Sequence, residues 1–272
     1  MFNSIPKRAK NLAQSFSDGQ KKRFGQFMIK RIAGLLLLDG GMVINSYGFK
    51  THLPVGKLRP SLLRLQELKI DEIIILNTDH SVSPEEDFVG LYSDFHSWHV
   101  STPISYGGGI SNLEQAKSVI RDGADRVVVS LKTLLDQQTF FDLGDSLGEQ
   151  AVIVHLPIFR QNSEIYVQNS TNLLLKKALE LFPEDWGGEI LVTSINNDGA
   201  LNPDWDLIRE SSKLIGDSRR LILSGGFASF EDILDGLKME SVESVSIGNF
   251  LHRMELSVIR IKNYVSREVL TR

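Results

Sequence analysis

Short apolar runs alternate with amphipathic stretches along most of the chain, and this alternation predicts repeated strand–helix units. From Lys30 onward, runs rich in aliphatic and β-branched residues are separated by helical patterns such as 112–122. The runs span residues 32–38, 72–76, 103–106, 126–130, 151–156, 189–194, 220–224 and 244–248. This order of elements is typical of parallel strands joined by right-handed crossovers.

The individual runs have an apolar character that indicates burial on both faces. Ile73 to Ile75 and Val127 to Val129 contain no polar residue, as expected for the strands of a parallel sheet. Eight such runs predict an α/β fold closed into a (βα)8 TIM barrel over 30–272, and a doubly wound open sheet is the alternative. No change of composition within 31–272 suggests a linker.

One segment of the chain is repeated about half a barrel later. Tyr106 to Ile110, with its Gly-Gly-Gly sequence, precedes a helical pattern and a strand that ends at Ser130. Ser224 to Phe227, with its Gly-Gly sequence, precedes a helical pattern and a strand that ends at Gly248-Asn249. The separation of ~120 residues predicts a barrel with a two-fold half-barrel repeat.

The repeated glycines are candidates for phosphate binding. Barrel chemistry lies in the loops after the carboxyl ends of the strands, and glycine leaves backbone N–H groups there unshielded. A Gly-Gly sequence alone is often only a tight turn, but the paired occurrence favours a ligand with a phosphate at each end. The predicted phosphate-binding residues are Gly107, Gly108, Gly109, Ser130, Ser224, Gly225, Gly226, Gly248 and Asn249.

Composition narrows the class of protein. With 42% hydrophobic and 24% charged residues the chain can bury a full core, and without cysteine it has no disulfide or thiolate site. The apolar runs are far shorter than the ~20 residues that span a bilayer. The net charge of −4 gives no general attraction to nucleic acid. We therefore expect a cytoplasmic protein without a metal or cofactor and without membrane or nucleic-acid partners.

Residues 1–29 form a basic extension before the barrel. They contain six lysines and arginines against the single acid Asp18. Such a start could be an organellar transit peptide or a solvated arm, and the sequence favours the arm.

Several titratable residues fall near the predicted strand ends. Asp79 follows the second run and Asp198-Gly199 follows the sixth, although Asp-Gly is also a common turn sequence. His155 lies within the fifth run, where a packed core histidine is the favoured interpretation and a side chain in the barrel interior is the alternative. None of the six histidines has metal-ligand spacing.

Taken in order, these motifs resemble the cyclase subunit family of imidazole glycerol phosphate synthase. The resemblance covers about residues 30 to 260 and is carried by the set of motifs, because none is specific alone. The motifs are Lys30-Arg31-Ile32, 70–76, Gly107 to Ile110, 123–127, 188–195, Asp198-Gly199 and Ser224-Gly225-Gly226.

The resemblance implies a function and a partner. The family binds a bisphosphorylated ribulosyl nucleotide and joins it to ammonia. That ammonia arrives through the barrel from a glutaminase bound at the amino-terminal end, which here would contact the region of Asp71 and Asp125. The charged ring that gates the ammonia passage matches Arg31, Glu72, Arg126 and Glu189. A purely structural plug of paired charges is the alternative interpretation of this ring.

The resemblance fails at the catalytic positions. The two aspartates that act as general acid and base in the family align with Leu37 and Pro157, neither of which can carry a proton. Loss of such groups costs ~100 to 10,000-fold each. Other positions at the mouth of the barrel, which is formed by the loops after the carboxyl ends of the strands, also depart from the family. They are Asn45, Asn77, Ser130, Leu131 and Asn196.

These departures leave three functional hypotheses. Leu36 to Leu38, Phe49-Lys50 and Asp79 to Ser81 resemble a branch found in surface-polysaccharide gene clusters, although Pro157 goes beyond that branch. The branch implies that ammonia passes from a glutaminase through the barrel to a phosphorylated or sugar acceptor, with a sugar amidotransferase as a further partner. The alternatives are a histidine-pathway cyclase whose acid and base have moved to Asp79, Asp198 or His155, and a non-catalytic barrel that binds a phosphorylated metabolite.

Overall fold

The computed structural model describes residues 29–79, 100–252 and 257–271. Most of the basic extension, together with His80, Ser81, His96 and His99, lies outside the described residues.

The centre of the fold is a closed ring of parallel strands. The ring is closed because β7 pairs with β10 as well as with β6. In order around the ring, the strands are β1 (Arg31–Asp39), β4 (Glu72–Asn77), β5 (Ile104–Gly107), β6 (Arg126–Ser130), β7 (Val152–Gln161), β10 (Glu189–Ser194), β11 (Arg220–Ser224) and β12 (Val242–Ile247).

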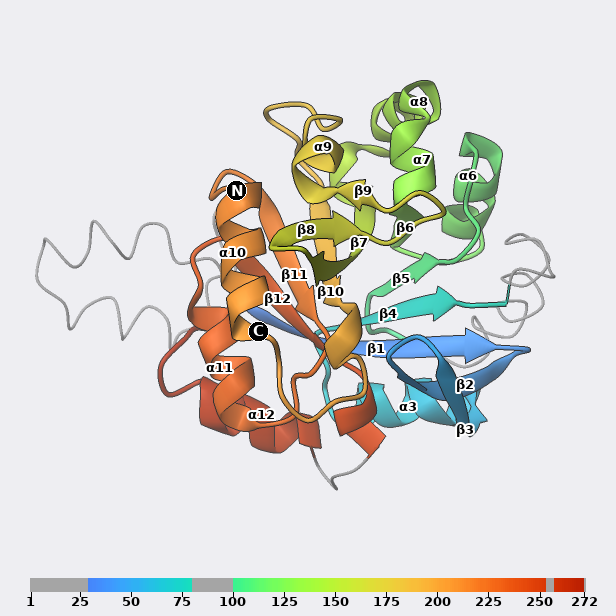
Figure 1. Cartoon of the computed structure of the whole chain (residues 1–272). Helices are drawn as coiled ribbons and strands as arrows, with labels where there is room; N and C mark the ends of the chain where they lie inside the picture. Colours follow the sequence, from blue (N-terminus) through green and yellow to red (C-terminus); the bar gives the residue numbers. More distant parts are fainter. Residues whose placement is uncertain (1–28, 80–99, 253–256, 272) are drawn as a thin grey trace, which may run out of the picture.

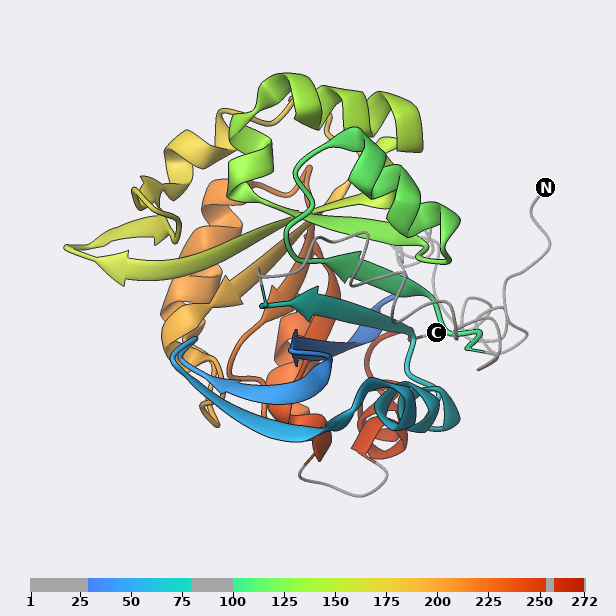
Figure 2. The ribbon, with the colours of Figure 1, turned by 90° about the vertical axis from the view of Figure 1, so that its right-hand side faces the viewer.

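Helices surround this ring (Figures 1 and 2). The α-helices are α3 (Leu58–Glu67), α6 (Leu113–Arg121), α7 (Leu131–Leu135), α8 (Gln137–Leu147), α9 (Leu175–Leu179), α10 (Trp205–Ile215), α11 (Phe230–Lys238) and α12 (Ser257–Val265). Short 3-10 turns are η1 (Glu149–Ala151), η2 (Ile195–Asn197) and η3 (Asn249–His252). The prediction of a TIM barrel is confirmed, and the open sheet is excluded by the closing pair of strands. None of the helices in the described ranges is long and apolar enough to cross a bilayer.

Two of the barrel strands continue beyond the ring into antiparallel extensions. β1 turns into β2 (Met42–Tyr47), which pairs with β3 (Thr51–Lys57). β7 turns into β8 (Glu164–Val167), which pairs with the short β9 (Leu173–Leu174). Figure 2 shows both extensions projecting from the same side of the barrel. They follow the first and the fifth barrel strands, as a half-barrel repeat requires.

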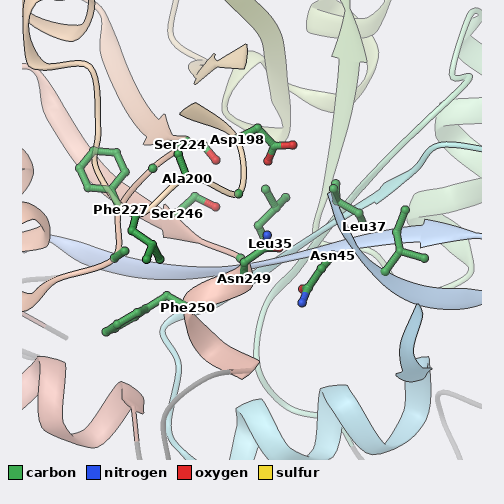
Figure 3. Close-up of a pocket in the computed structure, with 17 residues that line it drawn as sticks. Leu35, Leu37, Asn45, Asp198, Ala200, Ser224, Phe227, Ser246, Asn249 and Phe250 are labelled. Carbon is green, nitrogen blue, oxygen red and sulfur yellow. The ribbon is translucent and has the colours of Figure 1, made fainter. Parts of the chain in front are cut away.

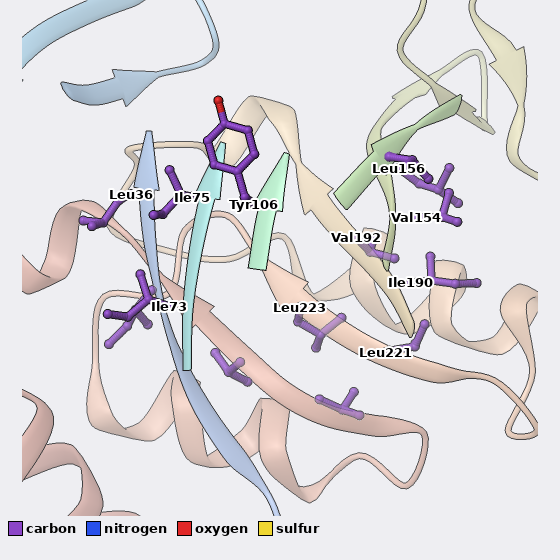
Figure 4. Close-up of a cluster of buried hydrophobic side chains, with 14 of the residues drawn as sticks. Leu36, Ile73, Ile75, Tyr106, Val154, Leu156, Ile190, Val192, Leu221 and Leu223 are labelled. Carbon is purple, nitrogen blue, oxygen red and sulfur yellow. The ribbon is translucent and has the colours of Figure 1, made fainter. Parts of the chain in front are cut away.

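Side chains alternate along the strands between two apolar layers. Residues that point outward, including Ile73, Tyr106 and Val192, pack against the helices (Figure 4). Residues that point inward form a separate cluster in the barrel interior: Ala33, Leu35, Ile74, Leu76, Val128, Ile153, Leu191 and Ile222, with Leu37 at its edge. Because both layers are apolar, the strands read as continuous apolar runs in the sequence.

Two aspartates fix the amino-terminal starts of the strands. The carboxylate of Asp71, just before β4, accepts a hydrogen bond from the Ile32 amide at 2.8 Å and one from the Lys262 ammonium at 2.5 Å. The carboxylate of Asp125, just before β6, accepts one from the Ile104 amide at 2.8 Å. Both residues, which we expected near a partner interface, therefore hold the barrel itself together.

The repeated glycine loops connect strands to helices in the same way in both halves. After β5, the loop ends at Asn112, whose side chain caps α6 by accepting from the Gln115 amide at 2.9 Å. After β11, the loop ends at Ser229, whose hydroxyl caps α11 by accepting from the Asp232 amide at 3.0 Å. Side-chain caps of this type satisfy amides of the first helical turn.

Candidate functional site

One candidate phosphate cradle lies between the carboxyl ends of β11 and β12 (Figure 3). A single pocket is lined by Ser224, Gly225, Gly226, Gly248 and Asn249, all of them predicted from the sequence. Gly225 has φ of +96°, and a Cβ atom on it would lie 2.6 Å from the Ser194 carbonyl oxygen, so this turn requires glycine. Neither the Gly225 nor the Gly226 amide donates a hydrogen bond to another described residue. These N–H groups can therefore contact an anion.

A second candidate cradle lies between the ends of β5 and β6. Gly108, Gly109 and Ser130 line a pocket there together with Lys132. Gly108 has φ of +119°, and a Cβ atom on it would lie 2.3 Å from the Asn77 carbonyl oxygen. Gly107 differs from the expectation, because it ends β5 and is not among the residues that line the pocket.

The two cradles are related by the half-barrel repeat and share a wall. Gly108 packs on the end of β4 as Gly225 packs on the end of β10, and these strands occupy equivalent places in the two halves. Leu37 lines both pockets. The arrangement offers donors for two anionic groups on opposite sides of one mouth.

The two positions that the resemblance aligns with the family's acid and base, Leu37 and Pro157, carry no group that can transfer a proton. The apolar side chain of Leu37 projects into the mouth and lines both pockets. Pro157 lies on β7 in register with Thr193 and lines neither of the two pockets. Neither of these two side chains can therefore act as a general acid or base.

The two candidate carboxylates have structural contacts. Asp198 lines the first pocket, and its Oδ2 accepts a hydrogen bond from the Phe49 amide at 3.3 Å while its carbonyl accepts from the Gly48 amide at 2.9 Å. Burial raises the pKa of Asp198, although the Phe49 amide opposes the shift. Asp198 thus fastens the β2–β3 turn. Asp79 lines neither of these pockets, and its amide donates to Asn77 Oδ1 at 2.8 Å.

The structure corrects the expectation of a packed core histidine at position 155. The His155 side chain points into the barrel mouth and lines the pocket of the β5–β6 cradle. Its Nε2 lies 2.9 Å from Thr193 Oγ1. Burial lowers the pKa of His155 to about 4, so the imidazole is neutral near neutral pH.

Two polar groups of the first pocket were not singled out as binding residues from the sequence. Asn45 Oδ1 and Ser246 Oγ are buried and have no hydrogen-bond partner among the described residues. Buried polar atoms are usually paired, so these two suit a ligand that carries hydroxyl groups. The alternation of β12, which turns Ser246 to the same side as Ser244, is the sequence signal that could have identified Ser246.

At the opposite, amino-terminal end of the barrel, Arg31, Glu72, Arg126 and Glu189 form a closed ring of alternating charge. Arg126 contacts both acids through its two terminal nitrogens. Arg31 Nη2 lies 2.6 Å from Glu189 Oε1, and Arg31 Nε lies 3.6 Å from Glu72 Oε1. The sequence-predicted set is therefore brought together as one cluster, to which Ser244 donates a hydrogen bond at Glu72 Oε1 over 2.9 Å.

Pairing keeps Glu189 and Arg31 charged despite their burial. Burial alone would raise the pKa of Glu189, but Arg126 and Arg31 outweigh it and hold the pKa below its usual value. Burial alone would lower the pKa of Arg31, but Glu72 and Glu189 hold it above its usual value. Since Glu72 and Glu189 are each 3% exposed, the ring closes the floor of the barrel with desolvated ion pairs.

The sequence of this chain matches one protein-family model over most of its length. The family model described as "Histidine biosynthesis protein" matches residues 32–257, which include all the barrel strands apart from Arg31, the first residue of β1.

Individual relatives agree with this match and are distant. A protein of Vibrio vulnificus that is provisionally named imidazole glycerol phosphate synthase subunit hisF2 is 26% identical over 85% of this chain and 86% of its own length. A protein of Campylobacter jejuni with the same provisional name is 28% identical over 77% of this chain and 84% of its own length. The imidazole glycerol phosphate synthase subunit HisF of Dictyoglomus turgidum is 27% identical over 88% of this chain and 96% of its own length. This chain is therefore a divergent, HisF-like member of the histidine biosynthesis protein family.

Proposed function

We propose that this protein is the ammonia-transferring subunit of a glutamine amidotransferase complex. It accepts ammonia from a glutaminase partner at the barrel floor and passes it through the barrel to a phosphorylated or sugar acceptor at the mouth. The observation that carries the proposal is the contrast between the two ends of the barrel. The floor keeps all four charged residues of the ring, whereas Leu37 and Pro157 remove the acid and base from the mouth.

The energetics of the ring support a role beyond closing the barrel. Buried ion pairs are costly to desolvate, and well-packed apolar residues of similar volume are often as stable or more so. A leucine plug would therefore close the floor at least as well. A polar ring can exchange hydrogen-bond partners and thereby open to let a small polar molecule pass.

The two cradles and the resemblance suggest the kind of acceptor. Unbonded glycine amides at Gly225 and Gly226, with Lys132 beside the other cradle, suit phosphate groups. The unpaired Asn45 Oδ1 and Ser246 Oγ in the first pocket suit hydrogen bonds with the hydroxyl groups of a sugar whose phosphate lies in the cradle. These features fit amidation of a sugar in surface-polysaccharide synthesis, with a sugar amidotransferase as a further partner.

A second candidate function is the cyclase reaction of histidine biosynthesis with a relocated acid or base. The observation that favours it is His155, a titratable side chain that points into the mouth near Leu37. The relatives named as HisF subunits are consistent with this candidate as well.

Nitrogen tracing in a reconstituted complex tests the proposal. The protein is combined with a glutaminase subunit of the imidazole glycerol phosphate synthase type and supplied to a cell extract with [15N-amide]glutamine and excess unlabelled ammonium. We expect label in a phosphorylated or sugar product despite the unlabelled ammonium, because conducted ammonia does not mix with solvent. Label diluted in proportion to the unlabelled ammonium would refute conduction. In parallel, turnover of the histidine-pathway ribulosyl nucleotide with ammonium would support the second candidate instead.

A further inference from the structure

The half-barrel repeat reveals a polar pair, His155 and Thr193, at positions whose counterparts in the first half are apolar. In the first half, Ala33 is in register with Glu72 and Leu37 with Leu76. In the second half, Ile153 is in register with Glu189 and Pro157 with Thr193. Ala33 and Ile153 are therefore equivalent positions of the two halves, and so are Leu35 and His155, two residues further along each strand. Likewise, Leu76 and Thr193 are equivalent, because each is in register with the strand position two residues further on. The second half thus has a histidine and a threonine where the first half has two leucines.

His155 and Thr193 contact each other and have apolar side chains on part of the surrounding wall. His155 Nε2 and Thr193 Oγ1 lie 2.9 Å apart, and Thr193 is 2% exposed. Leu37, Leu76 and Val128 line the same pocket as His155. Burial of a polar group costs free energy unless it is hydrogen-bonded, and the contact with Thr193 satisfies only one of the two ring nitrogens of His155.

One ring nitrogen of His155 remains available to the pocket. Thr193 engages Nε2, and no other described residue bonds to the ring. In the tautomer in which Nε2 donates to the threonine hydroxyl, Nδ1 carries a lone pair that can accept a hydrogen bond. The charged or titratable groups that line this pocket are Lys132 and His52.

His155 and Thr193 lie between the charged ring at the amino-terminal floor of the barrel and the mouth at its carboxyl-terminal end. The ring of Arg31, Glu72, Arg126 and Glu189 closes the floor, and the apolar interior cluster lies above it. His155 is in register with Leu191 of that cluster on one side and with Ser130 of the cradle on the other. A molecule leaving the apolar interior therefore meets His155 and Thr193 as it reaches the cradle.

We propose that His155, oriented by Thr193, is an ammonia-binding site where the barrel interior opens into the mouth. The inference rests on the proposed conduction of ammonia and names the group that receives it. The neutral imidazole accepts a hydrogen bond from ammonia, whereas the Lys132 side chain in the same pocket and the apolar Leu37, Leu76 and Val128 disfavour the charged ammonium ion. Ammonia is thereby held beside the phosphate cradle, where its lone pair can face a bound acceptor.

Nuclear magnetic resonance of the full chain labelled with 15N-histidine tests this site, with ammonium chloride as the probe. The ring resonances of His155, assigned through His155→Gln, are followed at alkaline pH, where free ammonia is abundant, and at mildly acidic pH, where nearly all is ammonium. Sodium chloride at equal ionic strength is the control for salt. His252, a half-buried histidine that also has a lowered pKa but lies outside both pockets, is the internal control.

We expect a saturable shift of the His155 resonances at alkaline pH only, with His252 unchanged. Thr193→Val should abolish the saturation because the ring loses its anchor, whereas Thr193→Ser should keep it. An equal response at both pH values, a response shared with His252, or no response would overturn the proposal. The measurement needs no glutaminase, so its failure is distinct from a failure of conduction in the nitrogen-tracing experiment.

Discussion

Replacing Arg126 with alanine is the sharpest test of how the barrel floor is held together. The side chain joins both acids of the ring and donates through Nε to Ser105 Oγ at 3.1 Å. Its removal leaves Glu72 and Glu189, each 3% exposed, with Arg31 as the remaining cation of the ring. The ring, formally neutral in the native chain, then carries one uncompensated negative charge.

The expected magnitude follows from this uncompensated charge. Removing one partner of a buried ion pair costs roughly 3 to 5 kcal/mol, because the remaining charge has lost its solvation without keeping its partner. The loss of Arg126 also removes one of the groups that hold the pKa of Glu189 down, so that pKa should rise. The destabilisation should therefore shrink as the pH falls and the orphaned carboxylate takes up a proton.

Urea unfolding at neutral and mildly acidic pH measures both effects. The matched control is Arg126→Met combined with Glu72→Gln, which leaves the Arg31–Glu189 pair and restores neutrality in the ring. We expect the double variant to regain most of the stability lost by Arg126→Ala. A loss below about 1 kcal/mol, typical of surface pairs, or a double variant no better than the single one, would show that desolvated pairing is the wrong description of the ring.

Three further predictions concern the mouth. Crystals grown in phosphate or sulfate should show anion density against Gly108-Gly109 or Gly225-Gly226, and loops closed over their own amides would count against the cradles. The isolated protein should not convert the histidine-pathway ribulosyl nucleotide in high ammonium, as product chromatography would show, whereas turnover within about tenfold of a cyclase would favour a relocated acid or base. Because the pKa of His155 falls from 6.5 to about 4 on folding, the unfolded chain binds the extra proton and stability decreases as the pH falls from 6.5 towards 4. This dependence amounts to about 3 kcal/mol, and His155→Gln should weaken it in urea titrations, whereas an unchanged profile would contradict the assigned pKa.

The barrel strands could be predicted from the sequence because burial on both faces leaves a simple signal. The predicted runs 126–130, 189–194 and 220–224 coincide with β6, β10 and β11. The other runs differ from their strands by no more than two residues at either end, except that β7 continues five residues beyond the predicted 151–156 run. The β2–β3 hairpin was not predicted. Residues 51–57 are mostly exposed and contain Pro54 and Gly56, so they carry neither alternation nor an apolar run.

The candidate site was only partly predictable. The charged ring follows from strand starts that the sequence marks clearly, together with the resemblance. The contact between His155 and Thr193 does not, because these residues are 38 positions apart and meet only through the register of β7 and β10. The role of Asp198 in fastening the β2–β3 turn was hidden for the same reason, since that hairpin was unknown.

The close packing of Gly108 on Asn77 and of Gly225 on Ser194 has an evolutionary consequence. These turns depend on backbone contact, so substitutions at neighbouring strand tips such as Leu37 or Pro157 can change the chemistry without disturbing the anchor loops. The architecture thereby uncouples the retention of a ligand from the reaction performed on it. A duplicated half-barrel of this kind can lose one activity and acquire another through a few side chains, while the scaffold that holds an anion and the floor beneath it stay in place.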